Sequence, residues 1–496
     1  MIVLPGLSKS LARIGQVPVV VVTDRYPPHA FGGAEVSLHI FLQSLGDPEG
    51  ILVVSLGDDN LVPKVYEVDG VQVLMLPRPG KWPLQSMPHA LAKGLDVITP
   101  EARRRLTTAP AAATLTLAQR LPSSDRQMLF ESLSTPAPRG GVVSDFAEFE
   151  TSAAVRSLRE VFRRCQPKLV HADNCRSILL TAIASRGLDL RLVGVVRDNR
   201  FQCVRHDQSM QVAGRHCSEC KLECAEVDAP RSEGLQRRML ERSREFRSEC
   251  LSAMDRVVVT SSFLESQIQT LLPDAKLVRI ANTPDDYETA LEHMEGVAEL
   301  PGTNLLVIGM LNENKGQIGL VRHLAALVER VPDAVVHFAG RGPRIERRLR
   351  EISAEAGLAD RIVFHGQVER AELYALLRQS QVVVLPTRWP EPFGRVPLEA
   401  AIAERPVVAF GVGGLPESIV EGETGYIVGA ERFEALIQRI AELAEDPMLR
   451  RRMGRKAREH VLAHYRVEQL QNQVCALWHD LIGAHAPTPR HSGVSA

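Results

Sequence analysis

Short apolar runs rich in β-branched residues recur along the chain, and stretches with helical spacing separate them. The first run, PVVVVT at residues 18–23, has the pattern of a strand that is buried on both faces. A Gly-rich turn and a helical stretch, AEVSLHIFLQSL, follow it. Similar runs predict further strands at residues 51–56, 71–76, 168–171, 191–196 and 256–260. The pattern predicts an α/β domain with a parallel sheet.

A second alternation of the same kind begins after a polar connector at residues 284–302. Its predicted strands are residues 304–308, 334–339, 361–365, 381–385 and 406–409. The stretches between them predict helices at residues 316–331, 344–356 and 371–379. Strands separated by helices of this length imply right-handed crossovers and a second parallel sheet. Ligands commonly bind in the crevices that such sheets form.

Three segments depart from this alternation. Residues 80–150 are rich in Pro, Ala, Ser, Thr and Arg, and we interpret them as an insertion of short helices and loops. A helical tail is predicted from about residue 432 to residue 481. The last residues, 486–496, have the composition of a disordered tail.

The composition of the 496 residues narrows the class of protein. Apolar residues make up 45% and charged residues 24%, which is the balance of a globular domain, and the net charge of -1 disfavours a nucleic-acid partner. The chain has neither a recognisable secretory signal nor an apolar stretch long enough to span a membrane. We therefore expect a cytoplasmic protein whose 8 cysteines are mostly reduced.

The segment EPFGRVPLE, residues 391–399, follows a predicted buried strand and leads into a helix. Pro397 suits the first turn of that helix, and Gly394 lets a ligand approach the backbone closely. The start of a helix favours a diphosphate. Glu399, about a turn further in, is placed to accept hydrogen bonds from a ribose diol. Glu391, in the preceding loop, is placed to reach sugar hydroxyls.

This segment, together with PVVAFGVGGLPESIVEGETGYIV at residues 406–428, resembles the donor domain of the retaining glycosyltransferases of family four. The resemblance implies the GT-B fold, in which two Rossmann-like domains face a cleft, here with the insertion in the N-terminal domain. It implies an acceptor-side domain at residues 1–300 and a nucleotide-sugar donor domain at residues 301–465. A helix at residues 466–485 would return to the N-terminal domain.

The resemblance also implies roles for single residues. Glu399 would bind the donor ribose, Glu391 would contact the donor sugar, and the adjoining backbone would hold sugar and phosphate. The donor-binding residues it implies in this segment are Glu391, Pro392, Phe393, Gly394, Arg395, Val396 and Glu399. In that family the reaction needs no divalent metal or other cofactor, because protein groups neutralise the departing diphosphate.

The segment IGMLNENKGQ, residues 308–317, resembles the element of the family that supplies a lysine to the diphosphate. Lys315 would stabilise the negative charge that develops on the leaving group. Met310 stands where the family commonly has an arginine, and Arg341 or Arg395 are the candidates to replace that cation. A second departure places Glu404 and Arg405 where the family usually has glycine, which affects a turn rather than the chemistry.

In the first domain, PPHAFGGAE resembles the N-terminal glycine loop of the family, so that Gly32 and Gly33 are expected to approach the donor diphosphate. His171 ends a predicted strand. Asp198 is retained in a segment where Arg197 replaces the histidine of other members. Either His171 or Asp198 is a candidate to position the acceptor or to stabilise the transition state, and a purely structural role is equally open for each. The catalytic candidates are Lys315, Glu391, His171 and Asp198.

Four cysteines at close spacing form a separate motif in residues 203–224. Cys203, Cys217, Cys220 and Cys224 fit a closed structural zinc site or, less readily, an iron–sulfur cluster, and unligated thiols are the alternative. Arg-rich stretches at residues 341–350 and 450–457 fit either solvated helix faces or peripheral contact with anionic lipid at the inner face of a membrane.

Together these features predict a metal-independent retaining glycosyltransferase, a hexosyltransferase that moves a sugar from a nucleotide-sugar donor to a glycan, lipid-linked or small-molecule acceptor. The alternatives are a non-catalytic nucleotide-sugar-binding protein, or an epimerase or phosphorylase of the same architecture. Met310 and Arg197 favour a non-catalytic protein, whereas the presence of Lys315, Glu391 and Glu399 argues against it.

Overall fold

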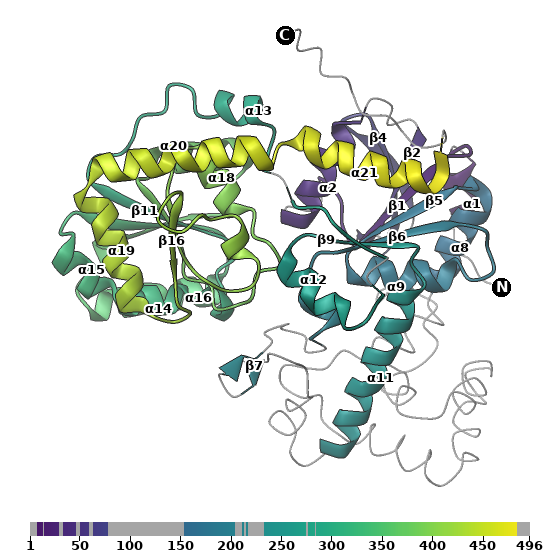
Figure 1. The fold of residues 1–496 in the computed structure, drawn as a ribbon, viewed down its shortest axis with the longest axis horizontal. Helices are drawn as coiled ribbons and strands as arrows, with labels where there is room; N and C mark the ends of the chain where they lie inside the picture. The colour runs from purple at the N-terminus through teal and green to yellow at the C-terminus, as the bar shows by residue number, and fades with distance from the viewer. Residues whose placement is uncertain are drawn as a thin grey trace. The chain divides into compact units, whose positions relative to one another are not determined.

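The structure is a computed structural model that describes residues 7–12, 14–28, 33–45, 50–58, 63–77, 153–203, 211–212, 215–216, 233–273, 276–282 and 284–483. The chain divides into two compact units, labelled by their elements in Figure 1. Unit 1 comprises residues 1–259, 265–279 and 474–496, and unit 2 comprises residues 260–264 and 280–473. The insertion predicted at residues 80–150 and the tail at residues 486–496 lie outside the described residues.

Unit 1 is built on an eight-stranded sheet with the order β10-β9-β6-β5-β1-β2-β4-β3. Its strands are β1 (Val19–Thr23), β2 (Ile51–Asp58), β3 (Lys64–Val68), β4 (Val71–Pro77), β5 (Leu169–Asp173), β6 (Arg191–Val196), β9 (Arg256–Val259) and β10 (Leu277–Arg279). All neighbours are parallel except β3 and β4. The order reverses between β1 and β5, and the crevice at the carboxyl ends of such a pair is where open α/β sheets bind ligands.

The helices of unit 1 are α1 (Leu7–Leu11), α2 (Gly33–Gln43), α8 (Ala153–Cys165), α9 (Cys175–Ala184), α11 (Glu233–Ser252) and most of α12 (Ser262–Gln269), and the unit also contains the short helix η3 (Asn199–Phe201) and the two-stranded pair β7 (Gln211–Val212) and β8 (Arg215–His216). Helix α9 packs directly against β1, β5 and β6 of the sheet, and α8 and α11 pack against α9. A Cβ on Gly194 of β6 would lie 3.1 Å from Ile178 of α9, so glycine permits this close contact between helix and strand.

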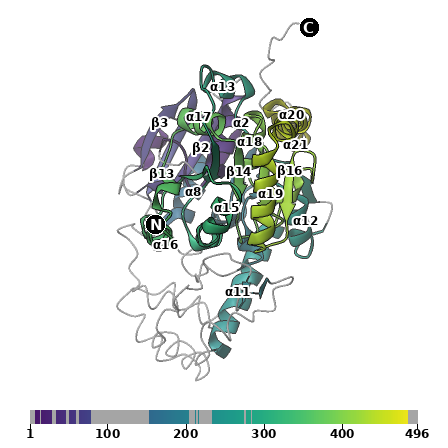
Figure 2. The same cartoon turned by 90° about the vertical axis from the view of Figure 1, so that its left-hand side faces the viewer.

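Unit 2 contains a six-stranded sheet, entirely parallel, with the order β13-β12-β11-β14-β15-β16. Its strands are β11 (Thr303–Ile308), β12 (Ala334–Ala339), β13 (Ile362–Gly366), β14 (Val382–Leu385), β15 (Val407–Phe410) and β16 (Gly425–Val428). In chain order this is the 3-2-1-4-5-6 arrangement of a dinucleotide-binding Rossmann sheet, with helices on both faces (Figures 1 and 2). The two-sheet parallel architecture predicted from the sequence is confirmed.

The helices of unit 2 differ in detail from the prediction. They are α13 (Tyr287–Glu292), α14 (Gln317–Arg322), α15 (Leu324–Arg330), α16 (Pro343–Glu355), α17 (Arg370–Gln379), α18 (Val396–Ile402), α19 (Phe433–Glu445), α20 (Pro447–His464) and the first part of α21 (Val467–Ile482). The single helix expected at residues 316–331 is two helices, interrupted at His323. There the imidazole ring stacks on Phe433 at 5.0 Å, and Phe433 also fills the space that a Cβ on Gly319 would need.

The predicted helical tail is three helices. Asp446 and Pro447 separate α19 from α20, because proline is tolerated in the first turn of a helix and Asp446 caps that turn by accepting from Met448 N and Leu449 N. Helix α21 begins in unit 2, and from Val474 onward it belongs to unit 1. There the fully buried ring of Trp478 makes edge contacts with Phe41 and His171.

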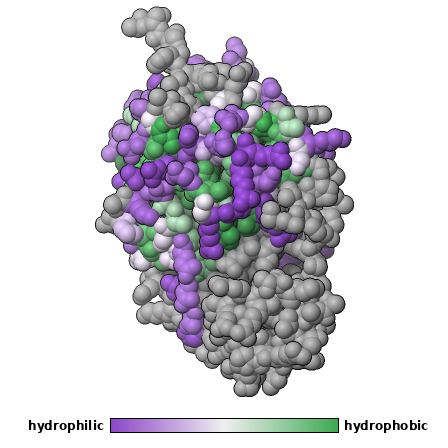
Figure 3. Space-filling view, turned by 90° about the vertical axis from the view of Figure 1, so that its right-hand side faces the viewer, coloured by the Kyte–Doolittle hydropathy of each residue, from purple (hydrophilic) through white to green (hydrophobic). Residues whose placement is uncertain are grey.

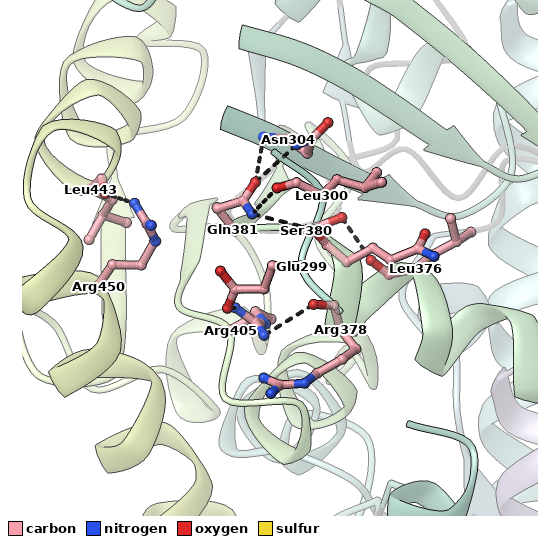
Figure 4. A network of polar contacts seen from close by, with 11 residues as sticks. Glu299, Leu300, Asn304, Leu376, Arg378, Ser380, Gln381, Arg405, Leu443 and Arg450 are labelled. Carbon is pink, nitrogen blue, oxygen red and sulfur yellow. Dashed lines mark hydrogen bonds and ion pairs between the residues drawn. The ribbon is translucent and has the colours of Figure 1, made fainter. Parts of the chain in front are cut away.

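The amino ends of the unit 2 strands are joined by a polar network (Figure 4). The Asn304 backbone N–H donates to Oε1 of Gln381 at 2.6 Å, and Nε2 of Gln381 donates to Leu300 O at 3.1 Å. Arg405, just before β15, donates to Glu299 at 2.6 Å and to Arg378 O at 3.1 Å. These contacts tie the starts of β11, β14 and β15 to one another, while open α/β sheets of this kind bind ligands at the carboxyl ends of their strands.

The surface mixes polar and apolar residues. On the face shown in Figure 3, hydrophilic side chains lie between small apolar areas. No helix in the described part of the chain is both long and apolar enough to cross a membrane.

Candidate functional site

The loops that follow β11 and β14 meet at the point where the strand order of the unit 2 sheet reverses. Asn314 O accepts hydrogen bonds from the backbone N–H groups of Arg388 at 2.8 Å and Trp389 at 3.1 Å. Gly316 has a φ of 71°, and a Cβ there would lie 1.7 Å from Pro386 O. Only glycine permits this approach, so the lysine-bearing loop is fixed against the glutamate-bearing loop.

This junction places Lys315 against Glu391, which lies 76 residues further along the chain. Nζ of Lys315 donates to Oε1 of Glu391 and lies 5.3 Å from the ring centroid of Trp389. The side chains are 23% and 14% exposed, so each is shielded yet reachable. Two residues that the sequence assigned to separate motifs therefore form one ion pair at the predicted ligand edge.

The Gly-rich segment at residues 411–417 packs against the loop that carries Glu391. Gly414 N donates to Glu391 O at 2.7 Å. Gly413 has a φ of 59°, and a Cβ there would lie 2.2 Å from Glu391 O. A Cβ on Gly414 would lie 2.6 Å from Pro392 O, and one on Gly394, with a φ of 88°, would lie 2.6 Å from Leu415. The Gly-rich segment at residues 411–417 thus fixes the backbone that carries the predicted donor residues.

The rest of the predicted donor segment lies in the same loop and helix start. Pro392 O accepts from Oγ of Ser261. Phe393 is buried, with its ring 5.8 Å from that of Tyr465. Val396 is the first residue of α18, and Arg395 directly precedes it. The structure therefore gives Phe393 a packing role in its side chain and leaves its backbone to the site.

Glu399 lies in the first turn of α18, and it is buried within a network of four charges. Its Oε1 lies 3.0 Å from Nη2 of Arg370 and 3.4 Å from Nη2 of Arg395. Both guanidinium groups also contact Asp285, with Arg395 at 2.8 Å. Although burial acts to lower it, the charges of Glu399 and Asp285 raise the pKa of Arg370 above its ordinary value.

Sequence reasoning missed Asp285 and Arg370. They are 110 and 25 residues before Arg395, in a connector and at the start of α17, and no local pattern joins them. The only available signal was a run of acids at residues 285–286 beside the start of the second alternation. The structure also shows that the charge of Arg395 is directed at Asp285 and Glu399.

In unit 1, charged side chains gather at the carboxyl ends of β1, β5 and β6. Asp173, the last residue of β5, accepts from Nε of Arg197 at 2.5 Å. Asp198 caps η3 by accepting from Arg200 N at 3.0 Å. Burial raises the pKa of Asp24, just after β1, to about 6, while the charges of Arg176 and Arg200 oppose that shift. The predicted candidate Asp198 thus lies in a cluster with two acids that the sequence did not single out.

The remaining candidates of unit 1 have different surroundings. Gly33 is the first residue of α2, close in sequence to the end of β1, and Gly32 lies outside the described residues. His171 was expected to end its strand, but it is buried in the middle of β5, which continues to Asp173, and its Nδ1 accepts from Nε1 of Trp478 at 3.3 Å. Burial lowers the pKa of His171 to about 4, so the imidazole is neutral at neutral pH. A role for His171 in catalysis stays a prediction.

The cysteine motif is described only in part. Cys203 is buried just after η3, whereas Cys217, Cys220 and Cys224 lie outside the described residues. Within the described ranges, no group of three or more His, Cys, Asp or Glu side chains is arranged to hold a metal ion. The zinc site therefore stays a prediction.

The second half of the chain is similar in sequence to known glycosyl transferases. Residues 297–460 match the family model of the glycosyl transferases group 1. The lipopolysaccharide core biosynthesis mannosyltransferase LpcC of Rhizobium leguminosarum bv. viciae is 32% identical over 46% of this chain and 66% of its own length. The GDP-mannose-dependent alpha-(1-6)-phosphatidylinositol monomannoside mannosyltransferase of Mycolicibacterium smegmatis is 30% identical over 40% of this chain and 52% of its own length. The matched region thus spans just under two thirds of the first relative and about half of the second.

Solved structures resemble this chain over nearly its whole length. The sucrose-phosphate synthase of Thermosynechococcus elongatus has a TM-score of 0.63 at 19% identity and covers 95% of this chain and 100% of its own. HepE of Anabaena, solved in complex with UDP, has a TM-score of 0.58 at 16% identity and covers 94% and 100%. At these identities the likeness shows the fold alone. This chain therefore has the GT-B fold, and residues 297–460, within its second unit, are similar to the glycosyl transferases group 1.

Proposed function

We propose that this protein is a retaining glycosyltransferase that binds its nucleotide-sugar donor on unit 2 and transfers the sugar to an acceptor hydroxyl. The observation that carries the proposal is the pairing of Lys315 with Glu391 at the point where the strand order of the unit 2 sheet reverses. Glu399 lies eight residues beyond Glu391 in the same loop and helix. The match of residues 297–460 to the group 1 family supports the same activity.

The positions of these side chains suggest a role for each of them in the reaction. When a donor binds, its diphosphate competes with Glu391 for the ammonium group of Lys315, and Glu391 is released to accept a hydroxyl of the sugar. Lys315 then stabilises the charge that develops as the bond between the anomeric carbon and the phosphate oxygen breaks. The acceptor oxygen bonds to that carbon on the same face, and its proton passes to the departing phosphate. Glu399, oriented by Arg370 and Arg395, accepts hydrogen bonds from the ribose.

We assign the acceptor to unit 1, where Asp198 lies in the charged cluster at the carboxyl ends of the strands. Carboxylates suit a hydroxyl-rich acceptor because each accepts several hydrogen bonds. A glycan, a lipid-linked sugar and a small polyol all present such groups. One relative is named as a mannosyltransferase and another as GDP-mannose-dependent, so GDP-mannose is the first donor to test, and the UDP complex of HepE adds the UDP-sugars.

The test is a panel of nucleotide sugars, first by thermal shift and then by donor hydrolysis and transfer. We expect one donor to raise the melting temperature and to be turned over in EDTA-treated protein, since Lys315 rather than a metal would neutralise the diphosphate. An NMR spectrum of the product should show that the anomeric configuration of the donor is kept. Glu399→Ala should abolish donor binding, and unchanged affinity would remove its assigned role. Stabilisation without any turnover would instead indicate a binding protein.

A further inference from the structure

Arg341 lies in the loop that follows β12, the strand next to β11 in the unit 2 sheet. Its side chain is exposed, and among the residues that the structure describes no hydrogen bond or ion pair engages its guanidinium group. The carboxyl ends of β11 and β12 meet at one edge of the sheet, so Arg341 and the lysine-bearing loop share that edge.

The backbone fixes Arg341 against that loop. Leu311 N donates to Arg341 O at 3.1 Å, and Gly309 N donates to Ala339 O at 2.9 Å. The flanking glycines allow this contact, since a Cβ on Gly340 would lie 1.9 Å from Gly309 O and one on Gly342 would lie 2.1 Å from Leu311 O. Arg341 is therefore held beside Leu311, four residues before Lys315.

The neighbouring cations already have carboxylate partners. Arg344 pairs with Glu313, and Arg388 pairs with Glu431. Arg395, the other candidate that the sequence offered, is only 6% exposed and contacts both Asp285 and Glu399. Withdrawing Arg395 from those contacts would leave two buried carboxylates with one cation fewer, which is costly. Within the described residues, Arg341 has no carboxylate partner.

The negative charge of a diphosphate exceeds the positive charge that Lys315 supplies, so a second cation such as Arg341 has a role in the donor site. A diphosphate carries more than one negative charge, whereas Lys315 supplies a single positive charge that Glu391 already shares. A guanidinium group binds phosphate oxygens through two parallel N–H donors, which an ammonium group cannot do. Met310, next to this contact, is 67% exposed and apolar, so it supplies no charge.

We propose that Arg341 acts with Lys315 to bind the diphosphate of the donor and of the nucleoside diphosphate that leaves. The proposal rests on the proposed function and deepens it, because it assigns the second cation of the donor site to the loop after β12. It also means that residue 310 and residue 341 are alternative positions for one positive charge.

The experiment measures the affinity of the full chain for UDP and GDP, and for uridine and guanosine, by calorimetry. Arg341→Gln should weaken binding of the preferred diphosphate about tenfold or more, the range of a charged hydrogen bond, and leave binding of its nucleoside unchanged. Arg347→Gln, which removes another exposed charge from α16, should bind as the wild type does. Adding Met310→Arg to Arg341→Gln should restore much of the diphosphate affinity.

Three results would overturn the proposal. The first is an Arg341→Gln variant that binds the diphosphate as the wild type does while Lys315→Gln loses affinity; this leaves the proposed function standing. The second is an equal loss of affinity for nucleoside and diphosphate, which would indicate a disturbed site rather than a lost phosphate contact. The third is a wild-type protein that binds neither UDP nor GDP, which would overturn the proposed function as well.

Discussion

Arg370 and Glu399 are joined by a contact of 3.0 Å between Nη2 and Oε1, and Asp285 binds the same guanidinium group. With Arg395 they form a cluster of two positive and two negative charges whose members come from a connector, α17 and the start of α18. Because the charges balance, each side chain can remain mostly removed from water. The carboxylate assigned to the ribose is therefore held by arginines before any donor arrives.

Asp285→Asn should destabilise unit 2, because it leaves two guanidinium groups sharing one buried carboxylate. Removing one partner of a buried pair costs on the order of 3 kcal/mol. Asp286→Asn is the matched control: Asp286 caps α13 by accepting from Thr289 N at 3.1 Å, and asparagine caps a helix equally well. Urea denaturation of both variants checks the prediction, and equal stabilities would contradict it.

Gly413→Ala should damage the donor site through the backbone. An added Cβ would lie 2.2 Å from Glu391 O and 2.6 Å from Glu391 N, so the loop that carries Glu391 must shift. We expect at least a hundredfold loss of transfer, on the order of the cost of misplacing a catalytic group by about 1 Å. Gly422→Ala shares the positive φ but has open space around the added Cβ, so it should keep its activity and lose about 1 kcal/mol of stability.

The stability of unit 2 should fall as the pH drops from about 6.5 toward 4. Burial, with a smaller contribution from the neighbouring His365, lowers the pKa of His337 to about 4. Asn304 Oδ1 accepts from Nε2 of His337, so Nδ1 must accept from His365, and protonation removes that acceptor. A histidine whose pKa is depressed by folding stabilises the protein above its unfolded pKa, and the contribution is lost as the pH falls through the folded value.

Urea denaturation at several pH values measures this effect. The slope attributable to His337 is at most about 1.4 kcal/mol per pH unit. His337→Phe removes the titrating group, so its unfolding free energy should vary less with pH between 6.5 and 4 than that of the wild type. Parallel curves for the two proteins would show that His337 does not titrate in this range.

Features of this chain that depend on neighbouring residues were easier to predict than those that depend on distant ones. Most of the strands and the loops after them were predictable, because apolar runs and turn residues report local structure. The same local patterns singled out Lys315, Glu391 and Glu399, whose roles stay predictions. The break at His323 was not, because it depends on packing against Phe433, which lies 110 residues away in sequence. The charged partners of Glu399 were not predictable either, because they also lie far away in sequence. The short strand β16, which begins at a glycine, was missed as well. The assignment of the four cysteines stays a prediction.

Glu404 offers a test of one local departure that the sequence did reveal. It occupies a turn where glycine was expected, and its φ of 56° is one that side chains with a Cβ rarely adopt. Its carboxylate accepts from Arg458 at 2.7 Å, but both side chains are 35% exposed, so this pair contributes little. Glu404→Ala loses the pair and keeps the strain, whereas Glu404→Gly loses the pair and relieves the strain.

Glu404→Gly should therefore be more stable than Glu404→Ala by about 1 kcal/mol, the cost of a left-handed backbone for a residue with a Cβ. Both variants lose the same contact with Arg458, so the difference between their unfolding free energies reports the cost of the left-handed backbone at residue 404. Glycine also gains entropy in the unfolded chain, which reduces the difference but does not reverse it. Urea denaturation of the pair measures it directly. If the alanine variant were the more stable of the two, the turn at residue 404 would not be strained.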